Sequence, residues 1–222
     1  MAAILPPAIA GRGTVARSVR ESPVMATTPT ADDIRRALAD NAVPGLRDVA
    51  AREQAAVAAV LRRGAVGLEM LFILRAEHPR DPWSGHMGWP GGRLDPADPS
   101  PLAAAVRETR EELGLDLDRD GELLGALPEA RTHLRRPGMP HWVASFVFAL
   151  ETSPELTLNY EVCETHWVPL AFLLDRRNRG RYVWTGRGIP MILPCYRFEG
   201  RVIWGLTLGM LDHLLDALRR VA

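Results

Sequence analysis

The stretch from residue 107 to residue 115, RETREELGL, constrains this chain most, because it places three glutamates within five positions. On a helix, Glu108, Glu111 and Glu112 stand at i, i+3 and i+4 and share one face. Like charges at that spacing destabilise a helix, whereas a hard divalent cation such as Mg²⁺ or Mn²⁺ binds carboxylate oxygens and reverses the repulsion. The pattern therefore indicates either a metal-binding face, in which Arg107 orients a glutamate, or a solvated helix face with salt bridges.

The residues around the glutamates predict where this helix begins and ends. Ser100 is a favourable N-cap, a proline suits the first turn, and Gly114 is a typical stop, so we expect a helix over residues 101–113. Three apolar positions are expected to anchor it to a sheet: Leu102, Val106 and Leu113. Upstream, the Gly-Gly pair at 91–92 gives a loop whose backbone can approach a metal or a phosphate closely.

Residues 92–115 resemble the signature of the Nudix hydrolase family, G-x5-E-x7-R-E-U-x-E-E-x-G-U, in which U is bulky and aliphatic. The matching positions are Gly92, Arg107, Glu108, Glu111, Glu112, Gly114 and Leu115. Asp98 stands at the position of the first glutamate of the signature, one extra residue lies between Asp98 and Arg107, and Thr109 replaces an aliphatic residue. The insertion falls in a proline-rich loop, where it disturbs the helix least.

The resemblance implies a mixed β-sheet between helices and the hydrolysis of a nucleoside diphosphate linked to another group. By the family pattern, Mg²⁺ or Mn²⁺ binds to the helix glutamates and to the Gly91 carbonyl oxygen. A further acid usually precedes a later strand, where NYEVCETHWVPL offers two candidates. We assign Glu161 to the catalytic residues, with Arg107 and the helix glutamates, and Glu164 to the metal ligands. The alternative for both Glu161 and Glu164 is an ordinary surface acid.

The loop before the glycines, RDPWSGHMGWPGG, resembles that of the coenzyme A pyrophosphatase branch of the family. That branch has an arginine, then a glycine, then three residues before an aromatic-Pro-Gly-Gly, and Arg80, Gly85 and residues 89–92 fit this spacing. Trp83 departs from the pattern, because a histidine is common there. The extra residue in the signature and RVIWGLT before a C-terminal helix also look like this branch. The resemblance therefore implies coenzyme A or its acyl forms as substrate, with ADP-ribose, nucleotide sugars, dinucleotides or nucleoside triphosphates as alternatives.

Coenzyme A would place its phosphates near arginines and its adenine near aromatic rings. Phosphate contacts are expected from Arg80, Arg93 and Arg131, with Arg135 and Arg136 as further candidates. The tryptophans expected to line the substrate site are Trp83 and Trp89, with Trp142 as a further candidate. The alternative for each arginine is a solvated surface position, and for each tryptophan it is core or edge packing.

Three segments are expected along the chain. Residues 1–30 carry no acid before Glu21 and are expected to be a disordered tail, with an upstream stretch before a start at Met25 or a transit peptide as alternatives. Residues 31–65 are expected to be a helical extension, because Thr30 can cap ADDIRRALADN and REQAAVAAVLRRG is predicted to form a second helix. Residues 66–222 are expected to be a Nudix-like hydrolase domain.

Strands are predicted at VGLEMLFILRAE, near residues 87–90, and at ELLGALPEA, HWVASFVFALE, THWVPL, YVWT, PMILPCYRF and RVIWG. A helical turn is predicted at LAFLLD and an amphipathic helix at LTLGMLDHLLDALRR. The predicted fold class is therefore α+β, an α/β/α sandwich with a mixed sheet and an N-terminal helical extension.

Charge and composition exclude several classes of protein. The formal net charge is zero, which argues against broad binding to nucleic acid or to a membrane surface. No apolar run is long enough to predict a membrane span. The two cysteines lack a CxxC motif and are typical of reduced thiols. We therefore expect a cytoplasmic enzyme that acts on a small nucleotide, and the family resemblance allows a homodimer. A non-catalytic nucleotide-binding module is the alternative, and the presence of all three glutamates argues against it.

Overall fold

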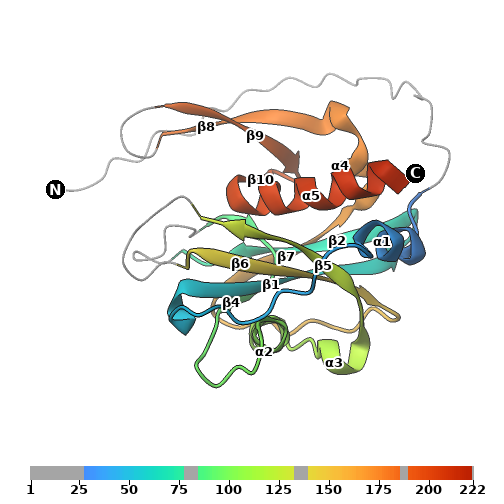
Figure 1. The fold of residues 1–222 in the computed structure, drawn as a ribbon. Helices are drawn as coiled ribbons and strands as arrows, with labels where there is room; N and C mark the ends of the chain where they lie inside the picture. The colour runs from blue at the N-terminus through green and yellow to red at the C-terminus, as the bar shows by residue number, and fades with distance from the viewer. Residues whose placement is uncertain (1–27, 78–84, 133–139, 186–189, 222) are drawn as a thin grey trace.

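The computed structural model describes residues 28–77, 85–132, 140–185 and 190–221. Within these ranges the chain forms a seven-stranded mixed sheet with helices on both faces and a separate three-stranded sheet (Figure 1). The strands of the large sheet are β1 (Gln54–Gly64), β2 (Gly67–Arg75), β3 (Met87–Gly88), β4 (Gly91–Arg93), β5 (Gly121–Arg131), β6 (Trp142–Leu150) and β7 (Val162–Pro169). Those of the small sheet are β8 (Arg179–Trp184), β9 (Met191–Phe198) and β10 (Arg201–Trp204). The predicted α+β class is confirmed.

The large sheet runs in the order β3-β2-β1-β6-β5, and β1 lies at its centre. One edge of β1 pairs in parallel with β6. The other edge pairs antiparallel with β2 over residues 61–64 and with β4 over residues 55–57. β1 and β2 therefore diverge, and β3 and β4 occupy the gap between them. This split places the Gly-Gly pair at 91–92 beside the central strand.

Helices cover the two faces of the large sheet (Figure 1). One face packs against α2 (Pro101–Leu113), and the other packs against α1 (Ala31–Leu38), α4 (Leu170–Leu174) and α5 (Gly205–Val221). Short helical turns complete the described elements: η1 (Ala51–Glu53), α3 (Leu117–Asp120) and η2 (Arg176–Asn178). None of the described helices is long and apolar enough to span a membrane.

The helix predicted within residues 52–64 is wrong, because this segment is β1. Alanine favours helices, but the side chains of β1 alternate between two buried layers, with Ala56 and Ala58 toward α2 and Ala55 and Ala59 toward α5. Burial on both faces removes the polar alternation that would have marked a strand. The predicted boundary between residues 65 and 66 falls in the turn between β1 and β2, so β1 belongs to the same sheet as the strands that follow.

Most of the remaining elements agree with the sequence. In the predicted extension, α1 is present, and Thr30 and Asp33 form a capping box at its start. The predicted helix over 101–113 has the bounds of α2, and the predicted strands from VGLEMLFILRAE onward correspond to β2, β3 and β5–β10, whereas β4 and α3 were not predicted. Of the predicted tail, residues 1–27 lie outside the described residues.

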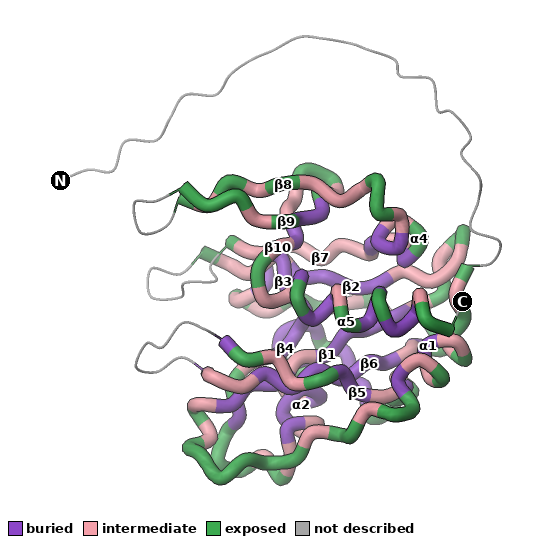
Figure 2. The backbone as a smooth tube through the Cα atoms, turned by 45° about the horizontal axis from the view of Figure 1, so that its top comes forward, coloured by how far each residue is buried: buried purple, intermediate pink, exposed green. Residues whose placement is uncertain are grey.

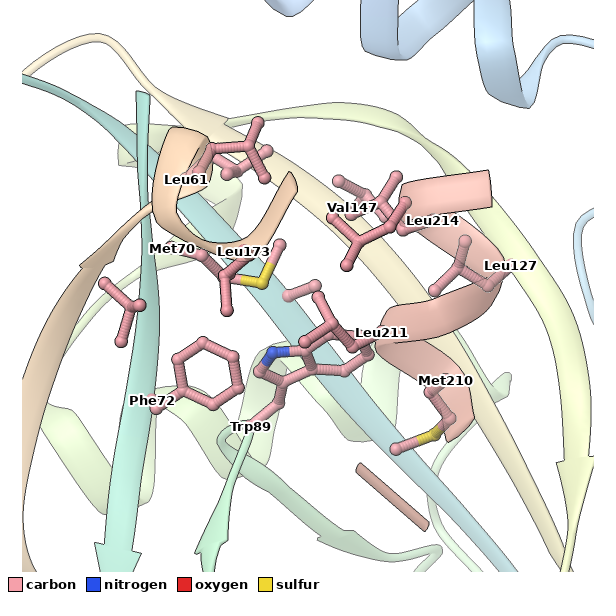
Figure 3. Close-up of a cluster of buried hydrophobic side chains, with 14 of the residues drawn as sticks. Leu61, Met70, Phe72, Trp89, Leu127, Val147, Leu173, Met210, Leu211 and Leu214 are labelled. Carbon is pink, nitrogen blue, oxygen red and sulfur yellow. The ribbon is translucent and has the colours of Figure 1, made fainter. Parts of the chain in front are cut away.

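The larger core lies between the sheet and α5. Figure 3 shows Phe72 of β2 and Trp89 beside Met210 and Leu211 of α5. The ring centroids of Phe72 and Trp89 are 6.3 Å apart, and Trp89 is only 3% exposed. This packing fixes the segment between β3 and β4, from which the Gly-Gly pair follows directly.

Candidate active site

Helix α2 carries the acidic segment, and its ends are those that the sequence predicts. Ser100 Oγ accepts a hydrogen bond from the Ala103 N–H (3.1 Å), and Gly114 ends the helix in the left-handed conformation with φ 65°. The sheet-facing side of α2 carries small residues, and Ala104 and Ala105 share a buried cluster with the alanines of β1. Because these contacts set the rotation of the helix, they determine which way its glutamates point.

Arg107 connects the first part of the acidic segment to the preceding loop. Its guanidinium donates two hydrogen bonds to Asp98, from Nε (3.0 Å) and Nη2 (2.9 Å). Nη1 donates to Glu108 Oε1 (2.9 Å) and to Glu111 Oε2 (3.1 Å), and Nη2 donates to the Arg93 carbonyl (3.2 Å). The hydrogen bonds that Arg107 donates to Asp98 lower the pKa of Asp98 below its ordinary value. Arg107 therefore bonds to two of the three helix glutamates, whereas the sequence predicts that it orients one.

Glu112 is the buried member of the set, with 1% of its surface exposed. Its Oε2 accepts a hydrogen bond from the Gly91 N–H (2.8 Å). Its Oε1 has no hydrogen-bond partner among the described residues, and Arg75 Nη1 lies 3.8 Å away. Burial raises the pKa of Glu112 to about 8, and the Gly91 and Arg75 contacts offset this only in part. A buried carboxylate oxygen without a partner is costly, so this position favours a bound cation.

The two glycines of β4 allow close contacts on both sides, with β1 at Gly91 and with α2 at Gly92. Gly91 has φ 142°, and a Cβ there would lie 2.6 Å from the Val57 Cα. A Cβ on Gly92 would lie 2.6 Å from the carboxyl carbon of Glu108. The Glu108 carboxylate thus occupies the space that any other side chain at position 92 would fill. Burial raises the pKa of Glu108, while Arg107 opposes this shift.

Glu161 joins the helix glutamates through the loop that precedes β7. The Asn159 N–H donates to the Glu112 carbonyl (3.0 Å), and Asn159 Oδ1 accepts from the Glu161 N–H (2.8 Å). The Glu161 carbonyl accepts from the Ala76 N–H (2.7 Å), which ties the loop to the end of β2. The charge of Glu161 raises the pKa of both Glu108 and Glu112. The structure therefore brings Glu161 to the acidic helix.

The assignment of Glu164 to the metal ligands is not supported. Glu164 lies within β7 and accepts hydrogen bonds from Arg201 of β10, with Nε at 2.9 Å and Nη2 at the other oxygen. His166 Nε2 is 3.1 Å from the same carboxylate. Arg201 lowers the pKa of Glu164, in contrast to the raised pKa values of the helix glutamates. Glu161 therefore lies at the acidic helix, whereas Glu164, three residues later in the chain, links the large sheet to the small sheet through Arg201.

The donor set fits a hard divalent cation. Carboxylate oxygens are typical ligands for Mg²⁺ or Mn²⁺, and one of them here is buried and has no hydrogen-bond partner among the described residues. Among the described residues, no three His, Cys, Asp or Glu side chains already stand in the arrangement of a metal site. The Arg107 guanidinium, which bonds to Glu108 and Glu111, supplies positive charge at the same face.

Comparison with known proteins decides the family. The model of the NUDIX domain matches residues 52–185, which include β1, the glycines, α2 and Glu161.

The chain belongs to the Nudix family.

Several relatives of this chain are described as Nudix hydrolases. The mitochondrial coenzyme A diphosphatase NUDT8 of Homo sapiens is 31% identical over 150 residues, which cover 67% of this chain and 62% of that protein. A protein of Enterobacter described as uncharacterized Nudix hydrolase NudL is 31% identical over 183 residues, which cover 76% of this chain and 84% of that protein.

Two further proteins are similar to this chain over shorter lengths or at lower identity. An uncharacterized Schizosaccharomyces pombe protein is 41% identical over 108 residues, and the match spans 33% of its length. Among solved structures, the NUDIX domain of Shewanella oneidensis NrtR complexed with ADP ribose is 18% identical and has a TM-score of 0.47. That alignment covers 78% of this chain and 89% of the other.

Two departures from the Nudix signature have local explanations. Asp98 is shorter than glutamate, yet it forms the two-point contact with Arg107. Thr109 replaces an aliphatic residue, is fully buried, and satisfies its hydroxyl by donating to the Ala105 carbonyl (2.7 Å). The Nudix helix therefore keeps its packing and its orienting arginine despite both changes.

The predicted substrate residues differ in where the structure places them. Arg80 and Trp83, like Arg135 and Arg136, lie outside the described residues. Trp89 is wrong as a stacking residue, because its ring is buried against Phe72 and α5. Arg93 is exposed at the end of β4, and its carbonyl contacts Arg107. Arg131 is exposed, and its guanidinium stacks on the Trp142 ring at 4.8 Å.

Two residues of the Nudix site were not predicted. Arg75 is the last residue of β2, and a cation that ends a buried apolar strand is the signal that could have found it. Asn159 bonds to both Glu112 and Glu161 through its backbone and side chain. No local sequence pattern indicates its role, because the contact depends on how the loop meets α2.

Proposed function

We propose that this member of the Nudix family cleaves the diphosphate of coenzyme A or its acyl thioesters, with Mg²⁺ or Mn²⁺ bound at α2. The products would be 3'-phospho-ADP and 4'-phosphopantetheine or its acyl form. The substrate assignment is supported by the spacing of Arg80, Gly85 and residues 89–92, and by relatives named coenzyme A diphosphatases at 30–31% identity. The chain spans 62% of the length of the human relative and 80% of the length of the mouse relative.

The environment of Glu112 is the observation that supports the hydrolysis of a diphosphate. Its buried carboxylate bonds to the Gly91 N–H through one oxygen, and the other oxygen has no hydrogen-bond partner in the part of the chain that the structure describes. Glu108 and Glu161 lie close enough to raise its pKa further. Such a concentration of negative charge is unfavourable alone and becomes favourable beside a cation, which a diphosphate substrate also requires.

The reaction is a hydrolysis in which one water oxygen attacks a phosphorus atom and the P–O bond of the diphosphate bridge breaks. A bound divalent cation would neutralise phosphate charge and lower the pKa of the attacking water. In this scheme Glu108, Glu111 and Glu112 would hold the cation, while Arg107 orients Glu108 and Glu111. Glu161 accepts the proton of the water, and the bridging oxygen leaves on the second phosphate. The chain thus supplies ligands, an orienting cation and a base.

The test is an activity panel with the purified protein in Mg²⁺ and then in Mn²⁺. Coenzyme A, ADP-ribose, NADH, diadenosine polyphosphates and nucleoside triphosphates are incubated separately, and products are separated by chromatography. We expect 3'-phospho-ADP and 4'-phosphopantetheine from coenzyme A, with slower turnover of the others. Faster hydrolysis of another diphosphate would reject coenzyme A as the substrate but would leave the assignment of the cation site unchanged.

A variant separates the site from the substrate. Glu111→Gln combined with Glu112→Gln should abolish hydrolysis of whichever substrate the parent prefers, because two carboxylates at the cation site are lost. The far-ultraviolet circular dichroism and the unfolding midpoint should remain those of a folded protein. Parental activity in the double variant would reject the site assignment.

A further inference from the structure

One face of the small sheet is apolar and takes no part in the chemistry above. Residues that pair directly across strands share a face, so Tyr182 lies with Leu193, Trp184 with Met191, and Trp204 with Cys195. Side chains alternate between the two faces along a strand, so the even-numbered residues of β8 and the odd-numbered residues of β9 lie on this same face. We name the following residues the aromatic shelf: Tyr182, Trp184, Met191, Leu193 and Trp204.

The rings of the aromatic shelf contact one another but stay partly exposed. The Tyr182 and Trp204 centroids are 4.7 Å apart, and those of Trp184 and Trp204 are 6.4 Å apart. Tyr182, Trp184 and Trp204 are all half-buried, and Met191 is 45% exposed. A cluster of large apolar side chains in contact with water marks a surface that can bind a ligand.

The opposite face of the small sheet accounts for its attachment to the rest of the molecule. Tyr196 and Ile203 point into the core beside α4 and α5, and the Tyr196 hydroxyl donates to the Leu173 carbonyl (2.7 Å). Arg179 forms an ion pair with Asp212 of α5. The fold therefore does not depend on the aromatic shelf to anchor β8, β9 and β10.

The aromatic shelf is continuous with the Nudix site. The Trp204 ring lies 4.7 Å from the His86 ring, which precedes β3. The His86 carbonyl accepts a hydrogen bond from the Arg75 N–H (3.1 Å), and Arg75 Nη1 lies 3.8 Å from Glu112 Oε1. Figure 2 shows β10 next to β3, below β8 and β9. A molecule whose diphosphate lies at Glu112 can therefore extend along β3 onto the aromatic shelf.

The charges around the aromatic shelf exclude the phosphorylated end of such a molecule. The shelf residues carry no charge, and among the described residues of that face only Arg197 does, at the end away from Trp184. Arg201 of β10 is paired with Glu164. An uncharged aliphatic chain loses water favourably on aromatic and methionine side chains, whereas a phosphate gains nothing there.

We propose that the aromatic shelf binds the acyl chain of a thioester substrate, so that the enzyme prefers acyl derivatives with longer aliphatic chains over free coenzyme A. This inference rests on the proposed function. Each methylene that leaves water on the shelf should raise kcat/KM by about fourfold, until the chain outgrows the shelf. The selectivity would then arise at a surface distinct from the metal helix.

The experiment measures kcat/KM for free coenzyme A and for its acetyl, butanoyl and octanoyl thioesters with the parent and four variants. Trp204→Ala and Met191→Ser alter the shelf at its two ends. Met191→Ser is included because Trp204→Ala could disturb the fold, whereas the Met191 side chain is 45% exposed and can be replaced with little loss of packing. Trp167→Ala is the matched control, since this tryptophan is also half-buried but packs with Arg62 on the other side of the sheet. Val66→Ala controls for an exposed apolar residue in the turn before β2.

In the parent, the octanoyl thioester should exceed free coenzyme A by at least about tenfold in kcat/KM. Trp204→Ala and Met191→Ser should reduce this ratio while leaving kcat/KM for free coenzyme A unchanged, and the controls should keep it. A ratio near one in the parent, or equal ratios in parent and shelf variants, would overturn the shelf proposal alone. A dimer that dissociates in Met191→Ser, with the ratio unchanged, would assign the surface to a second copy and also overturn it. Absence of hydrolysis of every coenzyme A species would overturn the proposed function together with the shelf.

Discussion

Replacing Gly92 by alanine tests whether the Glu108 carboxylate depends on the absence of a side chain at position 92. A Cβ built there lies 2.6 Å from the carboxyl carbon of Glu108 and 2.6 and 2.7 Å from its two oxygens. Carbon atoms in contact normally stand about 3.5–4.0 Å apart. The carboxylate must therefore move by about 1 Å, because it is the flexible end of a side chain and the backbone is fixed.

The consequences for activity and for stability should differ strongly. A displacement of about 1 Å in a group that positions substrate can cost about 100-fold in rate. We therefore expect kcat/KM of Gly92→Ala to fall about 100-fold. The backbone of Gly92 is not in the left-handed region, so alanine can adopt it, and the free energy of unfolding should change by less than about 1 kcal/mol.

The neighbouring glycine provides the contrast. Gly91→Ala places a Cβ against the backbone of Ala56 and Val57 at a positive φ, so it should destabilise the fold by about 2–6 kcal/mol through backbone strain and overpacking. Gly209→Ala on α5 meets no atom within 4 Å and is the control for activity; its free energy of unfolding should rise by about 0.5–1 kcal/mol, because alanine favours a helix more than glycine does. Activity is measured with the preferred substrate at saturating Mg²⁺, and stability by urea unfolding. Activity of Gly92→Ala within threefold of Gly209→Ala would refute this reading of the Glu108 contact.

Other predictions follow from the same contacts. Glu161→Gln should lower kcat by about 100-fold or more with little change in KM, whereas Glu164→Gln should keep the parental kcat; equal losses in steady-state assays would contradict the separation of these acids. Asp98→Asn should lower the free energy of unfolding at neutral pH by about 1.5–3 kcal/mol. Because Arg107 lowers the pKa of Asp98 in the folded protein, this contribution is present above the ordinary pKa of 3.8 and is lost as the pH falls through the lowered value. The difference between parent and variant in denaturant titrations should therefore shrink in acid, and a constant difference would argue against the ion pair. Ala58→Leu, in β1 beneath α2, should destabilise by about 1–3 kcal/mol in thermal unfolding, and a neutral result would argue against close packing there.

The acidic helix could be placed from the sequence because its signals are local. A cap, a proline in the first turn and a glycine stop all act within a few residues of the helix they bound, and α2 has the predicted bounds. The strand β1 could not be placed in the same way. Its alanines have a local preference for helix, and only pairing with β2, β4 and β6 makes the strand favourable.

The substrate residues show the same limit. Trp89 follows the pattern of a family loop, but whether an aromatic ring in such a loop faces ligand or core depends on the layer beneath it. Here α5 lies beneath, and the ring completes the core with Phe72 (Figure 3). Glu164 likewise lies on β7 opposite Leu74 of β2, where Arg201 of the small sheet reaches it.

The sequence by itself determined that the chain has an acidic helix face, because helix periodicity places Glu108, Glu111 and Glu112 on one side and needs no tertiary partner. It also determined the glycines at 91–92 and the orienting Arg107. Only the tertiary structure decided which outer residues complete the site. Arg75 ends β2 and Asn159 lies in the loop before β7, and both meet α2 beside Glu161, which the sequence had already predicted. These contacts depend on strand pairing over long separations, which no stretch of residues encodes alone.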